Sequence, residues 1–156
     1  MSSQKFQARQ GDVHIYEIDA IPSDAKPIKG DKGGRRIVLA YGEVTGHAHA
    51  FIPTSGKTQL FEDTKGRYLN VGDDAQVHKF REYVYAHPSG RNLIGYLDLC
   101  CHRGLQIDGS VMVREFDQAA EVLTHEEHGI VPLMPGWYEV PIQREYTPLG
   151  DRPVVD

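Results

Sequence analysis

Residues 36–52 read RIVLAYGEVTGHAHAFI, and this stretch decides the fold class. Its first part, 36–41, is a run of β-branched and aliphatic residues that predicts a strand. Gly42 and Gly46 interrupt the pattern, as glycines do at a bulge, a sharp bend or a close approach of a ligand. A second strand is expected over 47–52, where a proline then ends it. Two short strands around a glycine-bracketed turn are typical of a mainly β domain.

The second of these strands carries two histidines on one face. Side chains alternate faces along a strand, so His47 and His49 point the same way. Another pair, His125 and His128, lies in the segment LTHEEHG at 123–129, where a spacing of three suits a helical turn or a tight bend with both rings on one side. Neutral imidazole is the commonest side-chain metal ligand. We therefore predict one mononuclear metal site from the first pair and one or both members of the second.

Several further side chains belong to this predicted site. Zn²⁺ is the first expectation because it accepts three or four nitrogen ligands, whereas Fe²⁺, Mn²⁺ or Ni²⁺ would add a carboxylate. The nearby carboxylates that could ligate, orient a histidine or act as a catalytic base are Glu43, Glu126 and Glu127. With an open coordination position, a bound water could ionise near neutral pH, which favours hydrolysis or hydration. Arg144 and Tyr146 share a face of the last predicted strand and could hold an anionic substrate or pair with the glutamates.

The same histidines also have a plainer interpretation. An HxH pair can be half-buried polar residues on a strand, and HEEH can be a solvated turn. Its histidines are three rather than four apart, so the helix of the HExxH zinc proteases is not implied. His49 and His125 are 76 positions apart, and the sequence does not show that they meet. The remaining histidines stand alone and are interpreted as ordinary polar residues: His14, His78, His87 and His102.

Length and composition describe one soluble domain. A chain of 156 residues can bury a core without a disulfide or a metal. The net charge of −5 argues against sequence-independent nucleic-acid binding, and HPSGRN at 87–92 is the one local stretch to check for it. The adjacent Cys100 and Cys101 are poorly placed to pair with each other. Without a signal-like N-terminus or an apolar run of ~20 residues, they predict a reducing, cytoplasmic setting with no membrane span.

Elsewhere, short strand patterns alternate with turn residues. Strands are expected at 10–18, 59–62, 67–71, 76–86, 92–101, 105–107, 111–113, 130–133 and 136–146. The range 76–86 also fits a helical period and is assigned to a strand on its aromatic and β-branched content. Residues 1–8 are expected to form a loose arm and residues 116–122 one short helical turn. We predict a mainly β single domain over 1–156, a small barrel or a sandwich.

Short motifs in the chain resemble a family of small bacterial and phage proteins that has no assigned activity. They are RQGDV at 9–13, GEVTGHAH at 42–49, LTHEEHG at 123–129 and QREY at 143–146. The stretch from about 76 to 115 departs from the family pattern. It is predicted to be an added β-rich segment on a core formed by 9–71 and 116–148. The strand-borne HxH is also similar to the first motif of cupin barrels, although the glutamate of that motif is missing after His49.

Two functions of different classes follow. The first is a metal-binding β protein, and potentially a metal-dependent hydrolase-type enzyme that acts on a small molecule. The second is a structural or accessory interaction protein, such as a component of a phage particle or another assembly, with a protein partner and no catalysis. In that case the added segment could also mediate homo-oligomer formation. Convergence of the four histidines is the feature that separates the two.

Overall fold

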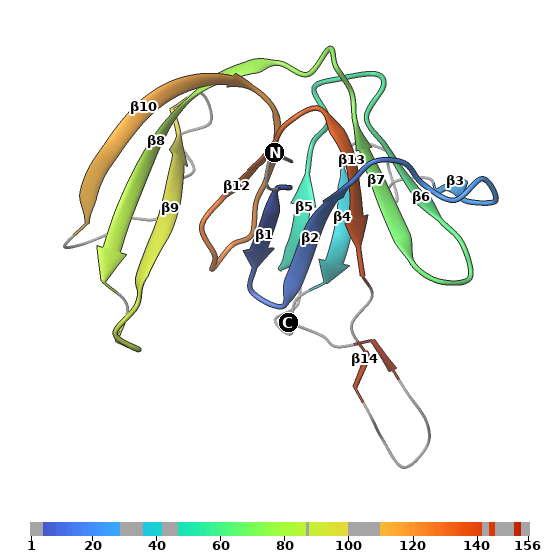
Figure 1. Ribbon diagram of the computed structural model, residues 1–156, viewed down its shortest axis with the longest axis horizontal. Helices are drawn as coiled ribbons and strands as arrows, with labels where there is room; N and C mark the ends of the chain where they lie inside the picture. Colours follow the sequence, from blue (N-terminus) through green and yellow to red (C-terminus); the bar gives the residue numbers. More distant parts are fainter. Residues whose placement is uncertain are drawn as a thin grey trace.

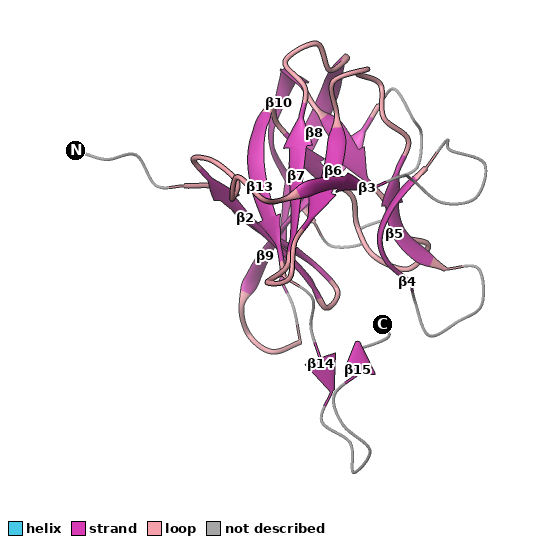
Figure 2. Cartoon of the chain, turned by 90° about the vertical axis from the view of Figure 1, so that its right-hand side faces the viewer, coloured by secondary structure: helices cyan, strands magenta, loops and turns pink. Residues whose placement is uncertain are grey.

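The computed structural model describes residues 5–28, 36–41, 47–86, 88–99, 110–141, 144–145 and 152–153. Within these ranges the chain consists of β-strands joined by loops, as Figure 2 shows. The mainly β fold class predicted from the sequence is confirmed. The described ranges contain no helix with the length and apolarity needed to cross a membrane.

The largest element is a six-stranded antiparallel sheet (Figure 1). Its strands, in spatial order, are β1 (Gln7–Gln10), β2 (Val13–Ile18), β13 (Gly136–Val140), β7 (Arg67–Val71), β6 (Gln59–Glu62) and β3 (Lys26–Ile28). The predicted β6–β7 hairpin is confirmed, with Leu60 opposite Leu69. The loose arm predicted for 1–8 is wrong at residues 7 and 8, because β1 pairs with β2 across a turn at Gly11, whose φ of 55° favours glycine. Since β1 and β3 remain edge strands, this sheet does not close into a barrel.

Two further strand pairs complete the main core. They are β4 (Ile37–Tyr41) with β5 (Ala48–Phe51), and β11 (Glu121–Leu123) with β12 (Val131–Leu133). The pairs meet where Ala50 and Thr124 exchange two backbone hydrogen bonds of 3.0 and 2.8 Å. The buried core that they share with the large sheet includes Ile15, Leu39, Phe51, Leu69, Leu133 and Tyr138. The helical turn predicted over 116–122 is wrong, because these residues are paired in two successive strands.

A three-stranded antiparallel sheet stands beside this core (Figure 1). It contains β10 (Val111–Ala119), β8 (Val77–Ala86) and β9 (Asn92–Asp98), in that order. The strand predicted over 76–86 is confirmed as β8. Residues 105–109 of the predicted hairpin lie outside the described part of the chain, and 111–113 begin β10. A second apolar cluster of Phe80, Ala120, Val122 and Ile130 connects this sheet to the rest. That this region is an addition to the core stays a prediction.

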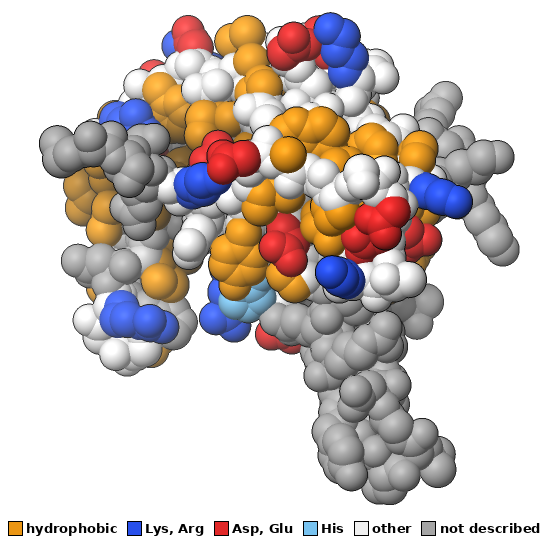
Figure 3. All heavy atoms as spheres, turned by 45° about the vertical axis from the view of Figure 1, so that its right-hand side comes forward, with side chains coloured by type: hydrophobic (Ala, Val, Ile, Leu, Met, Phe, Trp, Pro, Cys, Tyr) orange, Lys and Arg blue, Asp and Glu red, His pale blue; other side chains and the backbone are white. Residues whose placement is uncertain are grey.

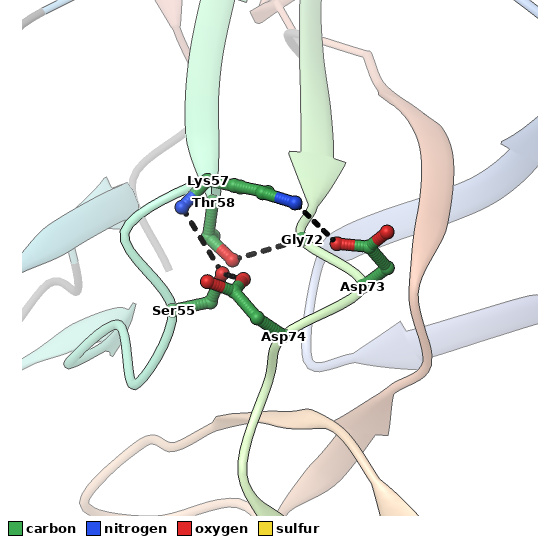
Figure 4. Close-up of polar contacts among 6 residues, drawn as sticks. All are labelled: Ser55, Lys57, Thr58, Gly72, Asp73 and Asp74. Carbon is green, nitrogen blue, oxygen red and sulfur yellow. Dashed lines mark hydrogen bonds and ion pairs between the residues drawn. The ribbon is translucent and has the colours of Figure 1, made fainter.

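A polar cluster joins the loops that follow β5 and β7. It comprises Ser55, Lys57, Thr58, Gly72, Asp73 and Asp74 (Figure 4). The Gly72 N–H donates to the hydroxyl of Thr58 at 2.9 Å, and Lys57 Nζ lies 3.0 Å from an oxygen of Asp73. A β-carbon at Gly72 would lie 2.7 Å from that of Lys57, so the close approach requires glycine. The cluster therefore fixes the point from which the chain leaves β7 for β8.

Candidate metal centre

Three of the four predicted histidines lie together. His49, His125 and His128 can each offer one ring nitrogen such that all three atoms lie within 4.8 Å of one another. The ring centroids are 4.2 Å apart for His49 and His125, 4.6 Å for His125 and His128, and 5.6 Å for His49 and His128. The two remote sequence segments therefore meet, and their imidazoles form a cluster that could hold a metal ion.

The backbone explains why these rings meet. His49 lies in β5, one residue before Ala50, which bonds to Thr124. Immediately after Thr124 the chain bends through 126–128 rather than continuing as a strand. The tight bend predicted from the HEEH spacing is confirmed, and it returns His128 toward His125 and His49. One pair of backbone hydrogen bonds thus aligns segments that are more than 70 residues apart.

Gln10 fixes the hydrogen position on the buried ring of His49. The Gln10 amide nitrogen donates to the carbonyl oxygens of Leu123 at 3.1 Å and Gly129 at 2.9 Å. Its amide oxygen must then face His49, whose Nδ1 lies 2.9 Å away. An amide oxygen can only accept, so Nδ1 carries the hydrogen and Nε2 presents a lone pair. His49 is 0% and Gln10 2% exposed, and such a buried partner is typical of an oriented metal-binding histidine.

The fourth predicted ligand, His47, lies beside the cluster rather than in it. Its ring centroid is 5.9 Å from that of His125, and the planes are nearly perpendicular at 86°. His47 Nδ1 is 3.7 Å from a carboxylate oxygen of Glu127, too far for a hydrogen bond but close enough for an ion pair. This places Glu127 and His47 at the edge of the candidate centre.

Glu126 has a different position from Glu127. Its carboxylate accepts the backbone N–H of Ala48 at 3.0 Å and so ties the bend to the start of β5. Burial acts to raise the pKa of Glu126, but the backbone N–H donors of Ala48 and of Glu126 itself, with the nearby His125 and His47, outweigh it and leave the pKa below 4.5. This contact suits a positioning residue, whereas Glu127 has a carboxylate oxygen 3.7 Å from Nδ1 of His47.

His125 makes a contact that bears directly on metal binding. The backbone N–H of Glu127 donates to Nδ1 of His125 at 3.0 Å. In a neutral ring whose Nδ1 accepts, the hydrogen is on Nε2. A metal at Nδ1 would displace the backbone N–H of Glu127. A metal at Nε2 would leave the ring hydrogen on Nδ1, where it would point at the hydrogen of the same backbone N–H. Metal binding to neutral His125 therefore requires the exposed bend at Glu127 to shift.

The cluster borders a cleft between the large sheet and the three-stranded sheet. Gln10 and His128 line one side, and Tyr85 and Tyr96 of the three-stranded sheet line the other. The cleft has a volume of about 390 Å³, within the range of small-molecule sites. Arg9 is the cationic side chain among the residues that line it. Of the three clustered histidines, His128 is the one that lines this cleft.

Three of the predicted site residues cannot be placed. Glu43 and Tyr146 lie outside the described part of the chain, and so does the side chain of Arg144, whose backbone begins β14 (Arg144–Glu145), paired with β15 (Arg152–Pro153). Their predicted roles, and the catalytic roles of Glu126 and Glu127, stay predictions. Gln10 was not identified as a site residue from the sequence, although it lies in the RQGDV motif.

Comparison with known proteins gives a family but no activity. A family model described as a domain of unknown function (DUF8820) matches residues 9–87. The matched region includes Gln10, His47 and His49 and extends to the end of β8. No curated protein and no solved structure matches the chain.

Proposed function

The chain belongs to the DUF8820 family of domains of unknown function, and we propose that it binds a divalent transition metal through His49, His125 and His128. The observation that carries this proposal is the convergence of three ring nitrogens within 4.8 Å. A set of three histidines with further space beside it is the donor set of catalytic rather than structural zinc sites. Zn²⁺ is the first expectation, with Fe²⁺, Mn²⁺ and Ni²⁺ as alternatives that would recruit a carboxylate.

The surrounding residues support binding of a metal rather than simple packing of histidines. Gln10 holds His49 in the form whose Nε2 carries no hydrogen, which is the form that binds a metal. Three imidazoles packed this closely would repel one another if protonated, whereas metal binding keeps all three rings neutral. The His125 contact with the Glu127 N–H adds a specific expectation, since this bend must shift on loading.

The same site could support hydrolase-type catalysis. A bound divalent ion would supply Lewis acidity and a water of lowered pKa. In this chain, Glu127 beside His47 is the carboxylate that could take a proton at the edge of the site, and Gln10 would orient His49. The cleft of about 390 Å³ would admit a small substrate between Tyr85 and Tyr96 on one side and His128 on the other.

Metal analysis of untagged protein tests the proposal. We expect about one equivalent of zinc after loading and desalting, and a saturable zinc titration that releases protons. The backbone amide signal of Glu127 should shift on loading. His14→Ala, which removes an imidazole from β2 outside the cluster, serves as the matched control and should bind like the wild type. Less than about a tenth of an equivalent of any transition metal, unchanged by added zinc, would refute the proposal.

A specific surface favours the alternative function in protein assembly. Val111, Met112 and Val113 are 68, 54 and 51% exposed at the start of β10, an edge strand. Exposed apolar residues on an edge strand suit pairing with another chain. Light scattering would test this: a dimer or larger species that dissociates in Val111→Lys supports assembly, and a strict monomer opposes it. Binding to nucleic acid has less support, since Lys and Arg side chains are scattered among acidic ones on the face drawn in Figure 3.

A further inference from the structure

We propose that a second pocket, on the opposite face of β5 from the histidine cluster, binds a small, mainly apolar molecule that donates one hydrogen bond to His78. The pocket has a volume of about 340 Å³. Ala48 and Ala50 of β5 line it, whereas His49 between them points into the cluster. Because side chains alternate along a strand, one strand separates the two sites.

The walls of this pocket are mostly apolar and small. Besides the two alanines they include Phe51, Ile52 and Val122, with the hydroxyl-bearing Thr54 and Thr124. The threonine hydroxyls already donate within the protein, that of Thr54 to Glu121 and that of Thr124 to the Ala50 carbonyl. Arg36 and Glu126 add one charge of each sign. The lining therefore favours a neutral ligand with a small apolar body.

His78 is the buried polar side chain in the lining of this pocket. The residue is 4% exposed, and its Nδ1 lies 3.0 Å from Oδ2 of Asp98, which is 0% exposed. Both ring nitrogens are buried and, among the residues that the structure describes, neither has a hydrogen-bond partner, so Asp98 faces Nδ1 at ion-pair distance without hydrogen-bond geometry. A buried ring nitrogen without a partner can be satisfied by a bound ligand, an ion or a water. In a cavity of this size with apolar walls, a small organic molecule could satisfy the nitrogen and fill the space together.

The carboxylates around His78 determine which ligand chemistry fits. A carboxylate that faces Nδ1 of His78 favours the ring hydrogen on that atom, so Nε2 can accept a hydrogen bond. The ligand must then donate, through a hydroxyl or an N–H group. An anionic ligand is disfavoured, because two buried acidic side chains, Asp98 and Glu121, already lie near His78. Phenol is the simplest probe with a planar apolar body and one hydroxyl, and benzene is its match without the hydroxyl.

Two variants of His78 separate a hydrogen bond from packing. The amide of Gln in His78→Gln reaches the position of Nε2, whereas the shorter amide in His78→Asn reaches only that of Nδ1. Phenol would be titrated into the full chain in the presence of EDTA, followed by the amide signals of Ala50 and Val122. EDTA ensures that phenol is not bound by a metal at the histidine cluster.

We expect saturable phenol binding to the wild type in the millimolar range. The phenol Kd of His78→Gln should be within about threefold of the wild-type value, and that of His78→Asn should be at least about tenfold higher. The wild type should bind benzene at least about tenfold more weakly than phenol. The proposal would be overturned by the absence of saturable shifts up to about 20 mM phenol. Equal binding by folded His78→Asn and the wild type would also overturn it. A pocket that holds only water gives the first of these results.

Discussion

The two faces of β5 contain histidines in contrasting surroundings. On one face, Nδ1 of His49 is hydrogen-bonded to the amide oxygen of Gln10, and two other imidazoles lie beside the ring. On the other face, His78 lies in the lining of a mainly apolar pocket, and its Nδ1 faces the carboxylate of Asp98. Either partner favours the ring hydrogen on Nδ1 and leaves Nε2 as an acceptor. The surroundings of the rest of the ring, two imidazoles around His49 and mainly apolar walls near His78, distinguish a candidate metal ligand from a candidate hydrogen-bond acceptor.

The largest effect should come from removing the carboxylate behind His78. Asp98→Ala leaves the buried Nδ1 of His78 without the carboxylate that faces it, and we expect the free energy of unfolding to fall by about 3 kcal/mol, the upper end of the cost of an unsatisfied buried donor. Urea unfolding measures this. Asp117→Ala breaks the exposed ion pair with Lys79, 3.2 Å long in the same sheet, and should lower stability by less than about 1 kcal/mol. Equal small losses in the two variants would mean that the carboxylate of Asp98 does not stabilise His78.

The second prediction concerns the opposite face of β5. His49→Ala removes the most buried ring of the cluster, and we expect zinc affinity to fall by more than about 100-fold. Competition with a zinc-binding dye provides the measurement, with circular dichroism to establish that the variant is folded. Phenol binding at His78 should be unchanged, because the two sites lie on different faces of the strand. Unaltered zinc affinity in the folded variant would remove His49 from the site.

The third prediction tests the amide behind His49. Gln10→Met keeps the length of the side chain, but Met cannot accept the Nδ1 hydrogen of His49. We expect zinc affinity to fall 10–100-fold, or about 1.4–2.7 kcal/mol, which is the usual loss when the hydrogen-bond partner of a metal-binding histidine is removed. Gln7→Met, an exposed position on the same strand, is the matched control and should bind zinc normally. If Gln10→Met binds zinc as tightly as the wild type, the amide has no orienting role.

The smallest effect is a pH dependence from Glu121. Burial raises the pKa of Glu121 above its ordinary value of 4.5, although the Thr54 donors and His78 act against the shift. The folded state therefore holds this proton more tightly than the unfolded state, so its contribution to stability is present below pH 4.5 and is lost as the pH rises through the higher folded pKa. The stability difference between Glu121→Gln and the wild type should move in favour of the variant over that window. A difference that stays constant with pH would contradict the shift.

Short-range patterns predicted much of this molecule. β-Branched and aromatic content identified β4 and β8, alternation placed His47 and His49 on one face of β5, and the spacing of His125 and His128 identified a bend that unites their rings. The helical turn predicted over 116–122 failed because these residues pair with β8 and β12, and tertiary pairing overrides local propensity.

The partners of the key histidines were beyond local patterns. The meeting of His49 with His125 depends on the Ala50–Thr124 bridge, and Gln10 bonds to a carbonyl 113 residues away. His78 was interpreted as an ordinary polar residue. It lies on the same face of β8 as the buried Phe80 and Glu82, and this period of two is a signal of an inward face. Its pairing with Asp98 depends on the register between β8 and β9, and no local pattern fixes that register.

Crystals grown with one equivalent of zinc, measured at the zinc absorption edge, would show whether the three imidazoles bind a metal. We expect one strong anomalous peak about 2.0–2.1 Å from a nitrogen of each of His49, His125 and His128, with the Glu127 N–H moved away from His125. No anomalous peak within reach of these three rings, in crystals where they remain packed as they are here, would contradict it.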